Sequence, residues 1–535
     1  PYTIFAAAGA SISTPTPASL LQGQALVNPK NYLCKNNLTM TRIILLTTSF
    51  LVFLNIDISY GRILPTGMGK TYATITAAAS VAVGGDTILC YDVSISGGMY
   101  IQNLKGSAQA WICILAAQPG HTTIVGGGNS IQFSDARYVC IDGFVISGQT
   151  GNGMNLDDGG SYESPSSHIR IKNCVFENIN ATGNNDLLKL SGIDSFWVSH
   201  CVFRNGAAGG SGIDMVGCHF GTIEDCSFSQ LGSNSIQAKG GSADLMITRN
   251  IFNNGGARAL NLGGSTGLSF FRPIDAKYEA ARIKVIANVI TGSEAPIAYV
   301  GSTQVEVSNN TLLLPTKWVA RILQETVDPT RFVPCGNNRF FNNIIVVDQR
   351  VNVEVNIGPN TAPETFAFEH NLWYKTSQAG WTGPQLPGTK SNNWVGDPLL
   401  VQDSLYVLQI TSPAIGKGLS YQGSPIKDIE GKPYRPVPSL GAWEIRTVIS
   451  NTEIPAPDVK VVIYPNPAAS EIVLMSNTEV GESICIYDME GNFVEQLTGR
   501  RDEGRLYFEV SRLSNGMYFL YNCKHHHYLG RFVKL

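Results

Sequence analysis

Six short segments of the sequence place charged and amide side chains at matching positions. They are "MNLD" (154–157), "LKLS" (188–191), "IDMV" (213–216), "IQAK" (236–239), "LNLG" (260–263) and "IAYV" (297–300). Their first and third residues are mostly apolar, so we expect these to point inward and the second and fourth to point outward. The second residues then form one outward column, Asn155, Lys189, Asp214, Gln237, Asn261 and Ala298. The fourth residues form another, Asp157, Ser191, Val216, Lys239, Gly263 and Val300.

Residues of these types could remove a proton from the carbon next to a carboxylate. This reaction, the eliminative cleavage of a uronate polymer, needs a general base and a cation that neutralises the carboxylate. Lys239 is the candidate base, and Lys189 is expected to act as a neighbouring cation or as a clamp on the carboxylate. Arg258 lies just before its strand, as do Asp186 and Asn234. The residues of these columns expected to bind substrate are Asp214, Gln237 and Asn261.

Two longer loops are expected to form the walls of a groove beside these columns. The insert 265–284 contains Arg272, Tyr278 and Arg282, and the loop 316–332 contains Trp318 and Arg321. Aromatic rings can stack on sugar rings, and arginine can bind carboxylates through two parallel hydrogen bonds. We therefore expect these five residues to bind substrate.

Three other interpretations of the same residues remain open. Polar residues on the outside of a solenoid are commonly solvated surface, and the same groove could bind a carbohydrate without cleaving it. A glycoside hydrolase would need clustered carboxylates as acid and base, which Asp157, Asp158, Asp186 and Asp214 could supply from different segments. His200 and His219 are interpreted as structural.

The elements that would position these residues belong to a repeat. The unit includes "IKNCVF" (171–176), "VSHCVF" (198–203), "IEDCSF" (223–228) and "ITRNIF" (247–252), at intervals in the twenties that indicate a solenoid. Alternation within each segment predicts strands, and hence an all-β fold built on a right-handed parallel β-helix over 62–446 with a helical N-terminal cap. The fourth position of the unit is expected to stack from coil to coil through Cys174, Cys201, Cys226, Asn250, Asn288, Asn310, Asn343 and Asn371.

The bulk composition limits the class of protein. A net charge of −3, without runs of Lys or Arg, gives no electrostatic basis for nucleic-acid binding. The 11 cysteines include no C-x-x-C pair, so their spacing predicts no metal site. We expect a monomer.

Both ends of the chain differ from the repeat region. Residues 40–61 begin with Met and one Arg, continue with an apolar run, and end in small residues, which is the layout of a secretory signal peptide. Residues 1–39 are interpreted as an upstream or disordered leader. A polar linker over 447–458 precedes short alternating segments over 459–535, which predict a small β-sandwich. The three histidines at 525–527 are interpreted as an exposed loop.

The last segment resembles the C-terminal sorting domain of the type IX secretion system of Bacteroidetes. The resemblance rests on "YPNP" (464–467), "IYDMEGNFV" (486–494), "LSNGMYFL" (513–520) and the closing "RFVKL". It implies export by that secretion machinery to the cell surface or the medium, and no catalytic role for 459–535.

The repeat region, roughly 72–445, resembles the pectate-lyase-like superfamily of secreted β-helix proteins, many of which degrade acidic polysaccharides. Its closing part, "SPAIGKGL…DIEGKPYRP…SLGAWEI", is similar to a segment common in secreted bacterial β-helix proteins. In alginate and chondroitin lyases of this fold the base is a lysine on such a strand, and an arginine about one coil later is the acid. The resemblance implies a polysaccharide lyase with Lys239 as base and Arg258, nineteen residues later, as acid, although the turn between them differs. It also implies Ca²⁺ as a cofactor, for which Asp157 and Asp186 are the candidate ligands.

Overall fold

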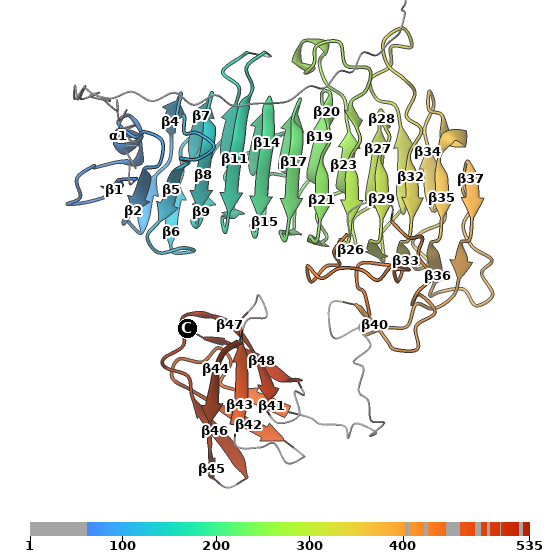
Figure 1. The fold of residues 1–535 in the computed structure, drawn as a ribbon. Helices are drawn as coiled ribbons and strands as arrows, with labels where there is room; N and C mark the ends of the chain where they lie inside the picture. The colour runs from blue at the N-terminus through green and yellow to red at the C-terminus, as the bar shows by residue number, and fades with distance from the viewer. Residues whose placement is uncertain are drawn as a thin grey trace, which may run out of the picture. The chain divides into compact units, whose positions relative to one another are not determined.

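Alternating apolar residues stack on one another from coil to coil and form three long parallel sheets (Figure 1). Within one sheet, for example, Ile141, Ile171, Val198 and Ile223 are successive partners in register. Each of these side chains is buried, so the core is a continuous apolar column along the axis of the solenoid. The fold is therefore the parallel β-helix that the repeat predicts.

The computed structural model describes the chain in nine stretches: 61–161, 163–401, 406–421, 426–445, 461–476, 483–488, 493–502, 504–523 and 528–534. The predicted leader (1–39), the linker (447–458) and the three histidines (525–527) lie outside the described residues, as does the predicted signal peptide (40–61) except for Gly61. Within the described parts, no helix is long and apolar enough to cross a membrane.

The three sheets are named A, B and C. Sheet A contains β1 (Ile63–Thr66), β2 (Thr87–Cys90), β5 (Ile112–Ala116), β8 (Arg137–Asp142), β11 (Ser166–Lys172), β14 (Ile193–Ser199), β17 (His219–Glu224), β20 (Ser242–Ala243), β21 (Met246–Thr248), β24 (Ala280–Ala281), β25 (Lys284–Ile286), β28 (Ser302–Thr303), β29 (Glu306–Ser308), β32 (Arg339–Phe341), β35 (Ala367–Glu369) and β37 (Thr389–Ser391). Sheet B contains β3 (Ser94–Ser96), β6 (Thr122–Val125), β9 (Phe144–Ser147), β12 (Val175–Glu177), β15 (Val202–Arg204), β18 (Ser227–Ser229), β22 (Ile251–Asn253), β26 (Val289–Thr291), β30 (Thr311–Leu313), β33 (Ile344–Val347), β36 (Leu372–Lys375) and β38 (Trp394–Val395). Sheet C contains β4 (Met99–Gln102), β7 (Ile131–Ser134), β10 (Met154–Asp157), β13 (Leu188–Ser191), β16 (Ser211–Val216), β19 (Asn234–Lys239), β23 (Arg258–Gly263), β27 (Ala295–Val300), β31 (Ala320–Leu323) and β34 (Val355–Ile357).

A short helix and an irregular segment flank the coils. Helix α1 (Ile75–Ala79) is capped by the Thr74 side chain, and it buries Ile75 and Ala78 against the first coils, as the predicted N-terminal cap requires. Two 3₁₀ turns, η1 (Leu268–Phe270) and η2 (Pro363–Thr365), lie in connections. A small antiparallel pair, β39 (Leu400–Val401) and β40 (Val407–Leu408), belongs to a separate apolar cluster that includes Trp443.

The predicted ladder of Cys and Asn side chains is present. The side-chain oxygen of each Asn accepts a hydrogen bond from the backbone N–H of the ladder residue one coil earlier, as Asn250 does from Cys226 (2.9 Å) and Asn310 does from Asn288 (3.0 Å). The ladder continues beyond Asn371 to Asn393. Because these groups are buried, the ladder satisfies backbone donors that no strand partner could reach.

We expect Asn310→Ala to destabilise the solenoid by about 3 kcal/mol or more. Asn310 accepts from both the backbone and the side chain of Asn288 and donates to Val285 O and Ser308 O, at 2.9 to 3.0 Å. Alanine would leave several buried groups without partners, each costing about 1–3 kcal/mol. Urea unfolding followed by circular dichroism measures the change. The exposed Asn253→Ala should change stability by about 0.5 kcal/mol or less, and equal effects of the two substitutions would refute the ladder's role.

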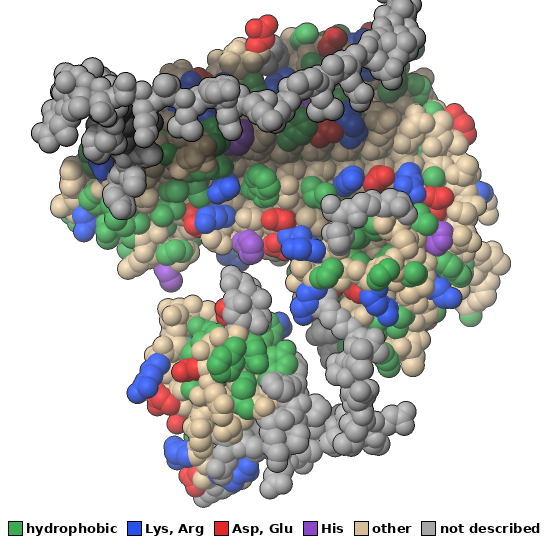
Figure 2. All heavy atoms as spheres, in the orientation of Figure 1, with side chains coloured by type: hydrophobic (Ala, Val, Ile, Leu, Met, Phe, Trp, Pro, Cys, Tyr) green, Lys and Arg blue, Asp and Glu red, His purple; other side chains and the backbone are tan. Residues whose placement is uncertain are grey.

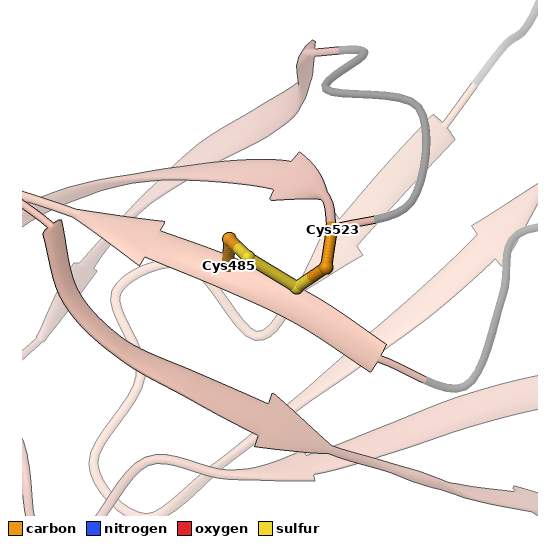
Figure 3. Close-up of a disulfide and its surroundings, with 2 residues drawn as sticks. All are labelled: Cys485 and Cys523. Carbon is orange, nitrogen blue, oxygen red and sulfur yellow. A yellow bond between two sulfur atoms is a disulfide. The ribbon is translucent and has the colours of Figure 1, made fainter.

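The C-terminal module is the predicted small β-sandwich, with two antiparallel sheets around an apolar core that includes Ile472, Ile486 and Phe532. One sheet contains β41 (Val461–Tyr464), β42 (Glu471–Ser476), β45 (Arg500–Asp502) and β46 (Arg505–Glu509). The other contains β43 (Ser483–Tyr487), β44 (Phe493–Thr498), β47 (Gly516–Asn522) and β48 (Tyr528–Lys534). A disulfide joins Cys485 on β43 to Cys523 just after β47, with a Cα–Cα distance of 5.2 Å (Figure 3). It cross-links neighbouring strands of one sheet.

Candidate functional site

The register of sheet C aligns the polar columns as the sequence predicts. In the second-residue column, each residue is the partner of the next: Asn155, Lys189, Asp214, Gln237, Asn261 and Ala298. In the fourth-residue column, Asp157 pairs with Ser191, Ser191 with Val216, and Val216 with Lys239. Lys189, Asp214 and Lys239 therefore lie on adjacent strands β13, β16 and β19.

The two lysines share one carboxylate. Lys239 Nζ lies 3.2 Å from Asp214 Oδ1, Lys189 Nζ forms an ion pair with Asp214 Oδ2, and Lys189 Nζ also lies 3.4 Å from Asp186 Oδ2. The two aspartate side chains are at most 2% exposed, whereas those of Lys189 and Lys239 are 21% and 14% exposed. The sequence predicts an exposed polar face, but the structure buries both carboxylates beneath the lysines.

Burial and charge set the titration of this cluster. Burial, with a smaller effect from the charge of Asp214, raises the pKa of Asp186 to about 6. For Lys189, burial alone would lower the pKa, but the attraction of Asp214 and Asp186 outweighs it and raises the pKa. Asp214 lies between the two lysines and pairs with both, and the predicted action of Lys189 on Lys239 stays a prediction.

The raised pKa of Asp186 predicts a stability that falls with pH. An unfolded aspartate has a pKa near 3.9, so between about pH 4 and pH 6 the folded state binds the extra proton and loses stability as the pH rises. Two pKa units correspond to about 3 kcal/mol. Asp186→Asn should remove this slope. The urea midpoint of the variant should therefore rise relative to that of the parent as the pH increases from about 4 to about 6. Parallel pH curves for parent and variant would contradict the assignment.

A cleft of about 450 Å³ opens beside this cluster on sheet C. Gln237, Lys239, Arg258, Asn261, Trp318 and Arg321 all line it. The segment 316–332 therefore reaches the site as predicted, but it is not all loop: residues 320–323 form strand β31 of sheet C, so Arg321 follows Ala298 in the second-residue column.

The two arginines of the cleft are held by amide oxygens and by one carboxylate. Arg258 donates to Asn261 Oδ1 (2.9 Å) and to Glu325 Oε1 (3.1 Å). Arg321 lies 4.4 Å from the ring centroid of Trp318 and donates to an amide oxygen, Asn356 Oδ1, at 3.1 Å. Burial and the nearby Arg258 lower the pKa of Arg321. Two arginines held close together in this way favour an anionic ligand between them.

Glu279 is a buried carboxylate that connects strand β19 to the two loops beside the cleft, and the sequence did not indicate it. It accepts from the backbone N–H of Gly240 (2.9 Å), which follows Lys239, and from the N–H and hydroxyl of Thr266 (2.9 and 2.7 Å). The hydroxyl of Thr326 in the second loop also donates to it. Glu279 thus ties both loops to the end of β19.

The insert does not place its predicted ligands in the cleft. Arg272 forms two 2.7 Å hydrogen bonds to Asp194 and also contacts His219, beside sheet A. Arg282 forms two 2.8 Å hydrogen bonds to Asp244 and a third, at 3.2 Å, to Tyr278. The prediction that Arg272, Tyr278 and Arg282 line the same groove as Lys239 is therefore wrong, because the insert turns toward sheet A.

The two candidate calcium ligands lie apart. Asp157 pairs in register with Ser191, the last residue of β13, and accepts hydrogen bonds from Gln132 (2.6 Å) and Ser134 (2.7 Å). Asp186 lies before the first residue of β13 and faces Lys189. Among the described residues, no three His, Cys, Asp or Glu side chains gather so that they could hold a metal ion. Asp157 and Asp186 therefore do not fit one Ca²⁺ site.

The two histidines differ in their surroundings. His219 receives a 2.8 Å hydrogen bond from Arg272 at Nδ1, and its Nε2 lies 3.1 Å from Gly241 O, which fits a donor at Nε2. It belongs to the ion-pair network of the insert, as its structural interpretation expects. His200 lies at a corner of the coil with a positive φ of 54°.

Two family models match the sequence. The model described as "Right handed beta helix region" matches residues 184–312, and the one described as "Secretion system C-terminal sorting domain" matches residues 462–528. The solenoid is thus a right-handed parallel β-helix. The sorting domain marks the protein for type IX secretion, so it is secreted or held at the cell surface.

Several solved structures resemble the chain at low identity. Pectate lyase Pel9A is 14% identical, covering 73% of this chain and 98% of that one, with a TM-score of 0.48. An alginate lyase from Paenibacillus sp. str. FPU-7 is 15% identical over 63% and 99% of the two chains, with a TM-score of 0.33. The A-module of the Azotobacter vinelandii mannuronan C-5 epimerase AlgE4 is 13% identical over 58% and 91%, with a TM-score of 0.41. A search of curated proteins finds no match.

Proposed function

We propose that the protein is a polysaccharide lyase that cleaves an anionic, uronate-containing polysaccharide by β-elimination in the cleft of sheet C. The observation that carries this proposal is the convergence of Lys239, Arg258 and Arg321 beside Trp318 in one cleft. These three cations outnumber the two carboxylates of the lining, Glu294 and Glu325, by one. The excess positive charge suits a sugar carboxylate, and the ring of Trp318 suits a sugar ring.

Each residue has a role in the proposed reaction. Lys239, after releasing its own proton, takes the proton from the carbon next to the carboxylate, and the electron pair of that C–H bond forms the C4–C5 double bond. The C4–O bond breaks, and its oxygen takes a proton delivered at Arg258. Arg321 neutralises the carboxylate on which negative charge develops. Asp214, itself paired with Lys189, holds the Lys239 amine in place.

One observation favours a second candidate, carbohydrate binding without cleavage. Lys239 lies in an ion pair with Asp214, and a lysine in that state is a ligand for a carboxylate rather than a base. A glycoside hydrolase with Asp186 and Asp214 as its acid and base is less favoured, because these side chains are at most 2% exposed and cannot reach a glycosidic oxygen. The lyase and binding functions use the same cleft.

The experiment that separates these functions incubates the full chain with polygalacturonate, polymannuronate and chondroitin. Elimination produces a conjugated C4–C5 double bond, followed as absorbance near ~235 nm, while affinity electrophoresis measures binding to the same polymers. Rising absorbance with at least one polymer supports the lyase. Binding without absorbance or new reducing ends would leave the binding function, and new reducing ends without absorbance would indicate a hydrolase.

A further inference from the structure

A second groove, of about 730 Å³, runs along the outside of sheet A, away from the cleft of sheet C. Its floor is a column of outward residues on successive strands, Thr222, Met246, Lys284, Glu306 and Arg339, each the register partner of the next. Its wall is a column of corner residues, Phe220, Asp244, Arg282, Gln304 and Asn337. Figure 2 shows charged side chains of both signs gathered over the outer face of the solenoid.

The wall residues share a left-handed backbone. Their φ angles lie between 51° and 60°, so every coil turns its corner side chain outward at the same place. Residues of several types hold this conformation here, among them Arg282 and Gln304. Phe220 is the aromatic residue of this wall.

Phe220 is also unusually exposed. Its side chain is 61% exposed beside Gly221, which offers no side chain to cover it. Little of the ring is buried in the fold, so most of its surface is available to a ligand. An exposed ring at the edge of a groove can stack on the apolar face of a sugar.

The cations of the groove offer ligands for a carboxylate. Its lining has three cations, Arg282, Lys284 and Arg339, and two carboxylates, Asp244 and Glu306. Arg282 is held in place by Asp244, and Arg339 lies 3.6 Å from Glu306 and 3.0 Å from Glu369 just beyond the lining, so these guanidinium groups are already positioned. Lys284 is exposed on the floor. Such preorganised cations lose little entropy when a carboxylate binds.

The geometry suits an extended chain. The five coils that line the groove are spaced by about 4.8 Å, so the groove is roughly 19 Å long and follows the solenoid axis. We propose that it is a second, non-catalytic binding site for an anionic polysaccharide, with Phe220 as the stacking platform and Arg282, Lys284 and Arg339 as carboxylate ligands. The choice of an anionic sugar polymer rests on the proposed function of the cleft. The predicted ligand Arg282 then serves sugar binding on sheet A.

The test measures affinity separately from turnover. Affinity electrophoresis of the full chain uses polygalacturonate, polymannuronate, poly-L-glutamate and dextran as probes, and a short oligouronate serves for initial rates. Phe220→Ala is expected to weaken binding of a uronate polymer roughly fivefold to tenfold, which corresponds to the loss of one stacking contact. The rate on the oligouronate should not change. Phe220→Asn, which suits the left-handed backbone, should weaken binding equally. The matched control is Phe493→Ala in the C-terminal module, where Phe493 is 56% exposed, and it should bind like the parent.

The outcomes distinguish this site from the cleft. Unchanged affinity of both Phe220 variants for the uronate polymers would overturn the second site, whatever the cleft does. An equal loss of poly-L-glutamate binding would overturn its assignment to sugar. Phe220-dependent uronate binding without any unsaturated product would support the second site and contradict the lyase.

Discussion

Lys239→Ala is expected to abolish the unsaturated product while affinity for the polymer stays within about tenfold of the parent. A general base acts in the chemical step, so its loss lowers kcat far more than it changes ground-state binding. The variant cleft keeps Arg258, Arg321 and Trp318, the residues proposed to bind the sugar. Initial rates near ~235 nm and affinity electrophoresis on the same preparations measure the two effects.

A matched control keeps the change of charge but moves it away from the cleft. Lys172 lies on β11 of sheet A and forms an ion pair with Asp142 at 3.2 Å, so Lys172→Ala also breaks a lysine–aspartate pair. It should leave both the rate and the affinity unchanged. A Lys239→Ala protein as active as the parent would show that another group is the base. Parallel losses of rate and affinity would make Lys239 a substrate ligand instead.

Glu279→Ala is expected to lower kcat/KM on the order of a hundredfold, although Glu279 is buried and touches no substrate. Without it, the N–H groups of Gly240 and Thr266 and the hydroxyls of Thr266 and Thr326 lose their acceptor. The loops then shift relative to Lys239, and a displacement of about 1 Å can cost that much in rate. Steady-state kinetics should show changes in both kcat and KM. We describe Glu279 as a positioning residue.

Two further variants separate positioning from general destabilisation. Glu279→Gln keeps the shape and one acceptor oxygen, so it should recover part of the activity. Glu444 is a similarly buried carboxylate that accepts from the N–H and hydroxyl of Ser439, in the closing segment. Glu444→Gln should lower the unfolding midpoint without changing kcat or KM of the folded protein. Equal kinetic effects of Glu279→Gln and Glu444→Gln would refute the positioning role.

Features that depend on the periodic pattern could be predicted from the sequence. The alternation of apolar residues determines which side chains point inward, and the repeat determines which residues stack. Hence the partners of Lys189, Asp214 and Gln237 across sheet C, and the ladder through Asn288 and Asn310, agree with the structure.

Features that depend on the path of the loops could not be predicted in this way. The insert has no periodicity, so nothing in the sequence indicates that Arg272 turns toward Asp194 or that Glu279 turns into the core. Alternation also does not indicate how far an outward-pointing side chain is buried. Asp214 points outward from its strand but is covered by two lysines. The disulfide between Cys485 and Cys523 spans 38 residues of an irregular β-sandwich, with no spacing motif to reveal it.

The central claim is that the cleft of sheet C cleaves a uronate polymer by elimination. The most direct test is a mass spectrum of the oligosaccharides released when the full chain digests whichever polymer it binds. Elimination should release fragments whose new non-reducing ends each lack one water relative to the intact sugar, and the Lys239→Ala protein should release none. Fragments that have each gained a full water at the cut would identify a hydrolase, and a bound polymer that stays intact would identify a binding protein; either result would contradict elimination in this cleft.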